Sequence, residues 1–180
     1  MRINLKQMNM KRLKKGQRGF TLIEILVVVV LIGILTGGIT ATISQVLTVN
    51  TRVSNRMVAV RQVQQAGDRV SKDVLQAQDV VDGGSWGFPL NLTREDYETG
   101  DLCEITYTIT ADNKLQRSLK ITPDGEDPTT RVSIVAEYID PAETSFIEAL
   151  EGGSFIFTVT ATVGGQSETR EYKVKPRPDS

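Results

Sequence analysis

A long apolar run near the N-terminus constrains the fold of this chain more than any other feature. Residues 20–43 read FTLIEILVVVVLIGILTGGITATI, and Glu24 is the only charged residue in the run. At about 1.5 Å per helical residue the run reaches about 36 Å, whereas the hydrocarbon core of a bilayer is about 30 Å thick. We therefore expect one tilted transmembrane helix.

Charge is distributed unevenly around the start of this run. Residues 1–19 contain seven basic residues and no acidic one, whereas the rest of the chain contains 14 basic and 22 acidic residues, a net charge of −8. Because positive charge favours the cytoplasmic side, we expect a single-pass inner-membrane protein with a cytoplasmic N-terminus. Residues after about Ser44 would lie outside the cytoplasm. The acidic remainder disfavours nucleic acid as a partner.

A secretory signal peptide also combines a basic start with an apolar run, but it is cut after that run. This run is too long for that interpretation, and the junction before it carries a specific string, Gly19-Phe20-Thr21-Leu22-Ile23-Glu24. The string closely resembles the N-terminus of type IV prepilins and pseudopilins. Glycine suits a cleavage position because, without a Cβ, it lets the backbone adopt an extended form.

The resemblance implies roles for three residues and a set of partners. Cleavage would fall between Gly19 and Phe20, Phe20 would become N-methylated, and Glu24 would pair with the N-terminus of a neighbouring subunit. The implied partners are other pilin or pseudopilin subunits, prepilin peptidase, the inner-membrane assembly platform, and membrane lipid before assembly. Residues 1–19 would be a leader that is removed, and the mature protein would end in a filament at the cell surface.

Helical spacing continues beyond the membrane segment, which predicts an amphipathic half of the same helix over residues 44–82. Its other face carries polar residues that include Asp73, and Asp82-Gly83-Gly84 is a suitable stop. Residues 36–38 could be a local unwinding site or a close-packing patch, and Gly67 is another weak point of the helix. The apolar residues recur three or four apart: Val46, Val49, Val53, Met57, Val60, Val63, Gly67, Val70, Val74, Ala77 and Val81.

After Gly84 the apolar period changes to two, which predicts an extracytoplasmic β-rich head over residues 83–180 and an α+β fold. We expect turns at 111–114 and 164–165, and the helix should cover one side of the antiparallel sheet. This long helix on a small sheet is the architecture that the resemblance implies. The expected strands are 104–110, 115–121, 131–138, 154–163 and 166–174.

Weaker marks suggest a subtype. The segment 70–77, together with 105–107 and 115–117, resembles the helix end and first hairpin of J-type minor pseudopilins and W-type minor pilins. Many major pilins have a proline where this chain has Ala41, and the cysteine pair that closes their C-terminal loop is absent because Cys103 is the only cysteine. These departures weaken the major-pilin interpretation.

Enzymatic chemistry is disfavoured. The chain has no histidine, and Cys103 lies in an alternating run that predicts a buried strand residue. We predict no cofactor and no metal, and we interpret the acidic loop 123–128 as a solvated turn in preference to a calcium site. Residues 94–98 are expected in an exposed loop. We expect Trp86, Phe88 and Pro89 to be core or lid residues, and the alternative is that they make contacts at a filament tip.

The sequence therefore favours a structural subunit, a minor pilin or pseudopilin that assembles through its N-terminal helix into a type IV pilus or a type II secretion-like filament. The alternative is a competence pseudopilin or an adhesive pilin whose head binds DNA or a surface. The sequence leaves the filament system, the neighbouring subunits and the contacts of the head open.

Overall fold

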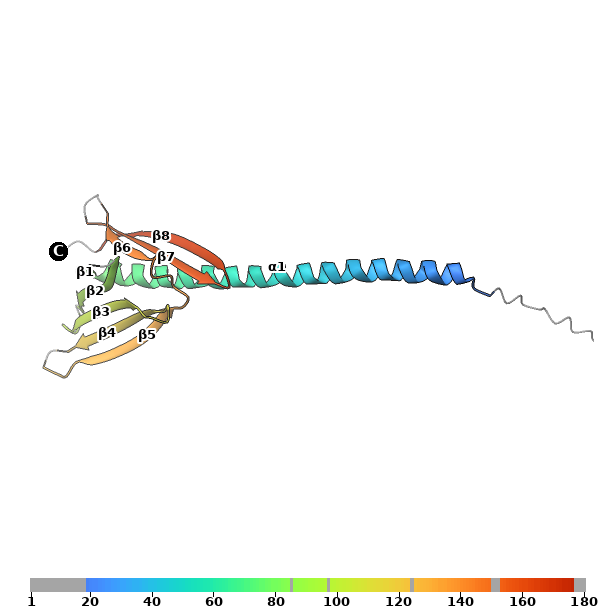
Figure 1. Ribbon diagram of the computed structural model, residues 1–180. Coiled ribbons are helices and arrows are strands. Elements are labelled where there is room, and N and C mark those ends of the chain that lie inside the picture. The colour runs from blue at the N-terminus through green and yellow to red at the C-terminus, as the bar shows by residue number, and fades with distance from the viewer. Residues whose placement is uncertain (1–18, 85, 97, 124, 150–152, 177–180) are drawn as a thin grey trace, which may run out of the picture. The chain divides into compact units, whose positions relative to one another are not determined.

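The computed structural model describes residues 19–84, 86–96, 98–123, 125–149 and 153–176. Within them, one helix, α1 (Leu22–Gln76), precedes eight strands that form two antiparallel sheets (Figure 1). The predicted α+β class is confirmed. The chain divides into two compact units, Met1–Val46 and Leu47–Ser180, so the first unit contains the start of α1 and the second contains its end and both sheets.

The first sheet has the order β1-β2-β3-β4-β5, and the second has the order β6-β7-β8. All neighbouring strands are antiparallel. The first sheet contains β1 (Asp79–Gly83), β2 (Gly87–Glu95), β3 (Leu102–Ile109), β4 (Leu115–Thr122) and β5 (Thr129–Ala136). The second contains β6 (Ser145–Glu148), β7 (Phe155–Val163) and β8 (Gln166–Val174).

The helix ends at Gln76, whereas the predicted amphipathic half extended to residue 82. Its last backbone bond runs from Ala77 N to Val74 O at 3.1 Å, and the next amide, Gln78 N, donates to Thr93 O of β2 at 2.8 Å. Residues 79–83 then pair with β2 as strand β1. The prediction was wrong because Val81 continues the helical spacing, although β-branched valines also suit a strand.

The five predicted strands correspond to β3, β4, β5, β7 and β8, and both predicted turns are present. The structure adds β1, β2 and β6. Residues Arg94 and Glu95, which were expected in a loop, end strand β2. Pro89 and the charged end of β2 obscured its pattern, and β6 has only four residues, which is too short for a periodicity to be recognised.

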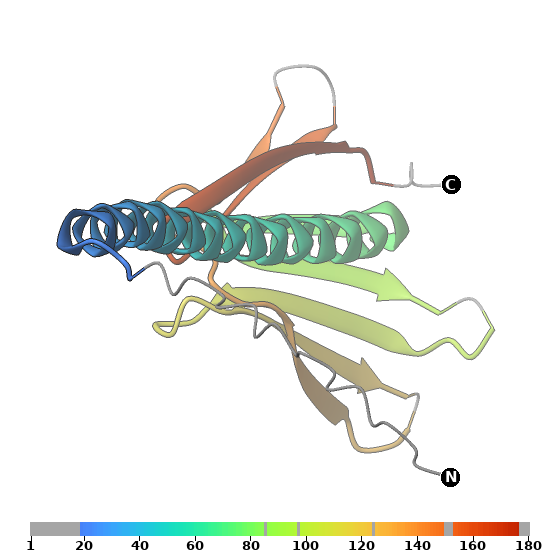
Figure 2. The ribbon, with the colours of Figure 1, turned by 90° about the vertical axis from the view of Figure 1, so that its right-hand side faces the viewer.

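One core joins the helix to both sheets within the second unit. Figures 1 and 2 both show the last turns of α1 with a sheet on either side. Helix residues Val63, Val70 and Val74 are fully buried in a cluster with Leu90 of β2 and Phe157 of β7. The expectation that the helix supplies the core layer of the sheet is confirmed, and the helix serves two sheets.

Gly67 is a packing position in this core. A Cβ built at Gly67 would overlap the ring of Tyr172, which lies on β8. The Tyr172 hydroxyl donates to Val63 O at 3.4 Å, one turn earlier on the helix. The glycine thus lets the aromatic ring of β8 lie directly on the helix backbone, which explains why a poor helix former occupies this position.

Candidate functional site

The segment that contains Gly19, Phe20 and Glu24 forms the start of α1 in the first unit. Leu22 is the first helical residue, and Thr21 precedes it. The backbone N–H of Glu24 donates to Thr21 O at 3.0 Å and to Thr21 Oγ1 at 3.3 Å. A threonine hydroxyl that accepts a bond from the third helical amide is an N-cap. Thr21 therefore fixes the start of the helix.

The role of Thr21 was missed in the sequence, although a signal was present. Threonine followed three residues later by glutamate is the spacing of a capping box, and Glu24 occupies the third helical position. An acidic side chain in the first turn also interacts favourably with the positive end of the helix dipole. The T-x-x-E spacing could have predicted the helix boundary without any resemblance to a family.

The backbone around the expected cleavage position is open. No atom of the residues that the structure describes lies within 4 Å of the place where a Cβ at Gly19 would stand, and Phe20 is 76% exposed. Glu24 is exposed and forms no ion pair with any residue that the structure describes. Gly19, Phe20 and Glu24 are thus brought together at one accessible helix terminus, with the Glu24 carboxylate available to a partner.

The apolar side chains that follow Glu24 are exposed on every side of the helix. The large ones from Ile25 to Ile43 are between 47% and 67% exposed. By length and composition α1 is able to cross a membrane. A helix that is apolar all round requires lipid or other helices around it, and an apolar helix near the N-terminus fits a membrane anchor.

The helix remains regular through the glycines at 37 and 38. Residues 36–38 are helical, so the unwinding that the sequence left open does not occur. Thr36 Oγ1 donates to Ile32 O at 2.8 Å, and Thr40 Oγ1 donates to Thr36 O at 2.9 Å. These bonds satisfy the hydroxyl groups inside the helix, which is the arrangement that an apolar environment requires.

In the second unit, Asp73 forms a buried polar cluster with two strand residues. Asp73 Oδ2 accepts a 2.5 Å bond from the Tyr107 hydroxyl of β3 and a 2.6 Å bond from Arg117 Nε of β4. Asp73 is 5% exposed, Arg117 is 6% exposed, and Tyr107 is fully buried. Asp73 was predicted on the solvent face of the helix, and that prediction was wrong because Arg117 supplies the charge that lets a carboxylate be buried.

The electrostatics of this cluster indicate a structural role. Burial raises the pKa of Tyr107 far above its ordinary value, and the charge of Asp73 and the hydrogen bond to it raise it further. Burial alone would lower the pKa of Arg117, but the hydrogen bond and charge of Asp73 raise it above its ordinary value. Tyrosine and arginine therefore keep their protons at neutral pH, and the cluster ties helix to sheet without a group poised for proton transfer.

The remaining candidates from the sequence are placed as follows. Cys103 is buried in β3, as predicted. Asp124 of the acidic loop lies outside the described residues, so the interpretation of that loop stays a prediction. In the part of the chain that the structure describes, no group of three acidic or cysteine residues could hold a metal ion.

Comparison with known proteins identifies the N-terminal segment. Residues 14–40 match the family described as "Prokaryotic N-terminal methylation motif", and this motif is the signal of type IV pilins and pseudopilins. The motif implies processing by prepilin peptidase and assembly with other pilin subunits. No curated protein and no solved structure matches the chain.

Proposed function

We propose that this chain, which carries the N-terminal methylation motif, is a minor structural subunit of a type IV pilus or a type II secretion-like filament. The motif supports a pilin-like or pseudopilin-like structural subunit that carries out no enzymatic reaction. The observation that carries the proposal is that the motif contains the start of a helix whose large apolar side chains from Ile25 to Ile43 are all exposed. Such a surface suits lipid first and the helices of other subunits later.

Maturation removes residues 1–19 and frees the amino group of Phe20, which is then methylated. The open backbone at Gly19 supports this assignment, because a peptidase must reach the bond that it cuts. The helix cap comes from Thr21, on the mature side of the cut, so the start of α1 does not depend on the leader. The mature chain keeps its membrane segment, residues 20–43.

Glu24 directs assembly. A charged side chain within a membrane costs at least about 2.5 kcal/mol, so its presence calls for a partner. The methylated amino group of Phe20 in a neighbouring subunit carries the complementary charge, and pairing favours one axial register between the two helices. The free carboxylate of Glu24 at the exposed start of α1 supports this role.

Before assembly the subunit sits in the inner membrane with its N-terminus in the cytoplasm and the second unit outside. Seven basic residues in the leader support this orientation, since positive charge is retained on the cytoplasmic side. The assembly platform of the inner membrane then moves the subunit into the filament.

The first experiment tests cleavage. We would express the full chain in a host with prepilin peptidase and measure the intact mass and the N-terminal residue. The expected product starts at N-methylated Phe20, whereas Gly19→Ala remains uncut or poorly cut. Gly16→Ala, which changes another leader glycine, should be cut like the wild type. An uncut wild type beside an active peptidase would refute the proposal and leave an anchored β-rich protein.

The second experiment separates assembly from cleavage. Glu24→Gln should still yield mature protein that starts at Phe20, but its recovery in sheared filaments should fall roughly tenfold, the effect of losing about 1.4 kcal/mol. Ile25→Leu, a neighbouring apolar exchange, is the matched control and should assemble normally. If Glu24→Gln assembled as well as the control, the pairing role of Glu24 would be wrong while the cleavage assignment could still hold.

A further inference from the structure

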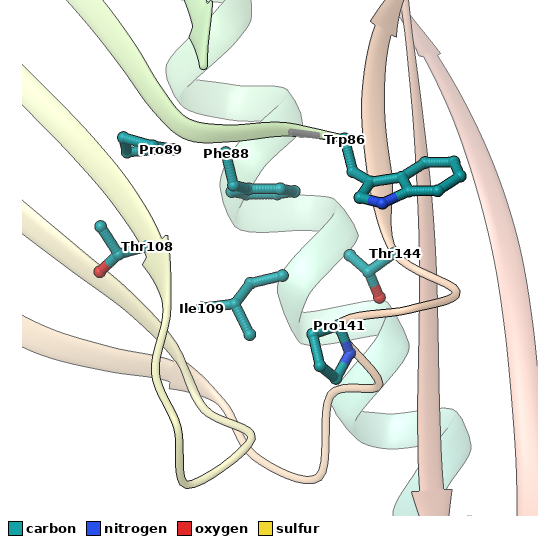
Figure 3. A pocket seen from close by; sticks show the side chains of 7 residues that line it. All are labelled: Trp86, Phe88, Pro89, Thr108, Ile109, Pro141 and Thr144. Atoms are coloured by element: carbon teal, nitrogen blue, oxygen red, sulfur yellow. The ribbon is translucent and has the colours of Figure 1, made fainter. Parts of the chain in front are cut away.

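One exposed surface of the second unit is a cleft of about 310 Å³ (Figure 3). Trp86, Phe88 and Pro89 line it together with Ile109 of β3. Phe88 packs against the core, as the sequence predicted, whereas Trp86 is 66% exposed, so the core interpretation was wrong for Trp86. None of the described lining residues is charged, so the cleft does not distinguish between classes of apolar ligand.

A second exposed surface is the stretch of α1 over residues 47–58, which we call the uncovered segment. It belongs to the second unit, but the first buried residue of α1 is Ala59. Every residue from 47 to 58 is exposed except Asn55, whose side chain lies against Gly164 in the turn between β7 and β8. The described strands therefore leave this part of α1 without cover.

The charge of the uncovered segment is of one sign. From Ile25 to Gly67 the chain contains three basic residues, Arg52, Arg56 and Arg61, and no acidic one. The next part of the helix differs, because residues 68–73 combine two acidic with two basic residues. A helix surface that faces only water commonly carries both signs. The arginines therefore indicate a partner with negative charge.

Two of the arginines form a pair on one face of the helix. Arg52 and Arg56 are four residues apart, which makes them neighbours on the helix surface, whereas Arg61 follows five residues later on a different face. Arg52 forms no ion pair with a described residue, and Arg56 lies 3.8 Å from Glu168 with its side chain 68% exposed. Such an exposed pair contributes little, so both guanidinium groups are available.

Apolar side chains lie beside the two arginines. Val49 and Val53 are 52% and 51% exposed, and each precedes one of the arginines by three residues. Residues three apart lie next to each other on a helix, so an apolar row and a basic row run side by side. An amphipathic surface with basic residues suits the boundary between the acyl chains and the headgroups of anionic lipid.

The distance from the membrane segment fits this partner. Nine residues separate Ile43 from Arg52, and nine helical residues span about 14 Å. The headgroup region extends about 5–8 Å beyond the hydrocarbon core. Helical side chains tilt toward the N-terminus of the helix, here toward the membrane segment, and a long arginine side chain covers much of the remaining distance. Arg61 lies a further 14 Å along the helix, roughly.

We propose that Arg52 and Arg56 bind the headgroups of anionic phospholipids in the outer leaflet of the inner membrane before assembly. The contact would hold α1 at one depth in the bilayer. Entry into a filament has to replace these lipid contacts, so anionic lipid favours the membrane-bound state of the subunit. The choice of leaflet rests on the orientation proposed above, but the lipid contact itself does not depend on cleavage or assembly.

Hydrogen exchange of the full chain in lipid nanodiscs tests the proposal. Peptides that cover residues 47–58 should exchange more slowly with equal parts phosphatidylglycerol and phosphatidylcholine than with phosphatidylcholine alone, because bound lipid suppresses local opening. Each arginine near an anionic surface strengthens the attraction about fivefold. Arg52→Gln or Arg56→Gln should therefore reduce the difference, and the double variant should remove it. High salt should weaken it in the wild type.

Arg61→Gln is the matched control, since it removes the same charge farther from the membrane segment and should retain the difference. Equal exchange of the wild type in both kinds of nanodisc would overturn the proposal. An equal loss in Arg61→Gln and in the double variant would also overturn it, because net charge alone would then be responsible. Slow exchange that follows the number of subunits per nanodisc, and not phosphatidylglycerol, would instead identify acidic groups of a neighbouring subunit as the partner. Cleavage at Gly19 and recovery in filaments are measured separately, so neither result decides the other.

Discussion

The two parts of α1 contain similar apolar residues in opposite surroundings. In the first unit Val28 and Val29 are 47% and 62% exposed, whereas in the second unit Val63 and Val70 are fully buried. The second unit also buries polar Asp73, while the first unit buries no residue that the structure describes. The later stretch of the helix therefore has its packing partners within the chain, and the earlier stretch has none among the residues that the structure describes.

This difference shows how one helix can combine folding with assembly. Burial of a valine side chain stabilises the second unit by about 1.5–3 kcal/mol, which the exposed valines of the first unit do not contribute to folding. The exposed valines of the first unit contribute their free energy of burial only when lipid or other helices remove them from water. Substitutions in the second part should therefore change stability, and the same substitutions in the first part should change membrane association or assembly.

The largest effect is expected at Asp73. Asp73→Ala leaves Arg117 buried and unpaired, and the free energy of unfolding should fall by about 3–5 kcal/mol. Chemical unfolding of the full chain in detergent, followed by near-UV circular dichroism, would measure the change. Asp68→Ala, on an exposed position of the same helix, should change stability by less than about 0.5 kcal/mol. Equal losses in the two variants would show that Asp73 is not a buried anchor.

A pair of valines tests the comparison directly. Val70→Ala removes two methyl groups from the core and leaves a cavity, so the second unit should lose about 2 kcal/mol. Val29→Ala makes the same chemical change in the first unit and should leave that unfolding transition in place. Both would be measured by chemical unfolding in the same detergent. A loss on Val29→Ala as large as on Val70→Ala would mean that the first part also packs within the chain.

Alanine substitutions at Gly67 and Gly37 should have different effects on the thermal unfolding temperature in the two parts of α1. Alanine is the better helix former by about 1 kcal/mol, but a Cβ at Gly67 overlaps the Tyr172 ring, and overpacking costs about 1–3 kcal/mol. Gly67→Ala should therefore lower the thermal unfolding temperature. Gly37→Ala meets open space and should not lower it. If both variants were neutral, the ring of Tyr172 would not lie on the helix as described.

The sequence predicted the features that depend on local pattern. The helix in the first unit follows from its apolar length, and β7 and β8 follow from alternation around Gly164 and Gly165. The end of α1 was harder to predict from the sequence, because Val81 satisfies both helical and strand spacing. Pairing with β2 decides between the two. Strand β6 is defined mainly by its neighbour β7, which a local pattern does not record.

The candidate site residues likewise divide into those that a local pattern predicts and those that only long-range pairing brings together. Gly19, Phe20 and Glu24 are adjacent in the sequence, so a motif could identify them together, and Thr21 could have been added from its spacing to Glu24. The Asp73 cluster joins residues 34 and 44 positions apart. Its members lie in three separate segments of the chain, and only the strand register that places Tyr107 opposite Arg117 brings both to Asp73.

The smallest expected effect is a loss of stability at alkaline pH that originates in the second unit. Burial raises the pKa of Tyr107 when the chain folds, so the folded state keeps a phenolic proton that the unfolded chain releases near pH 10. The stabilisation from this difference is complete below pH 10 and is lost progressively above it. The free energy of unfolding should then fall by about 1.4 kcal/mol per pH unit for this one group.

Tyr107→Phe would isolate that contribution. The variant should be less stable at pH 8, because Asp73 loses a hydrogen bond, but its stability should decline less steeply between pH 10 and 11. Tyr172→Phe is a useful comparison, since burial also raises the pKa of Tyr172 but the residue is only half-buried. Membrane association of the first unit, measured by flotation with liposomes, should not follow this titration. If Tyr107→Phe declined as steeply as the wild type, the alkaline loss would have to come from another group, and the buried cluster would not be the feature that distinguishes the second part of α1 from the first.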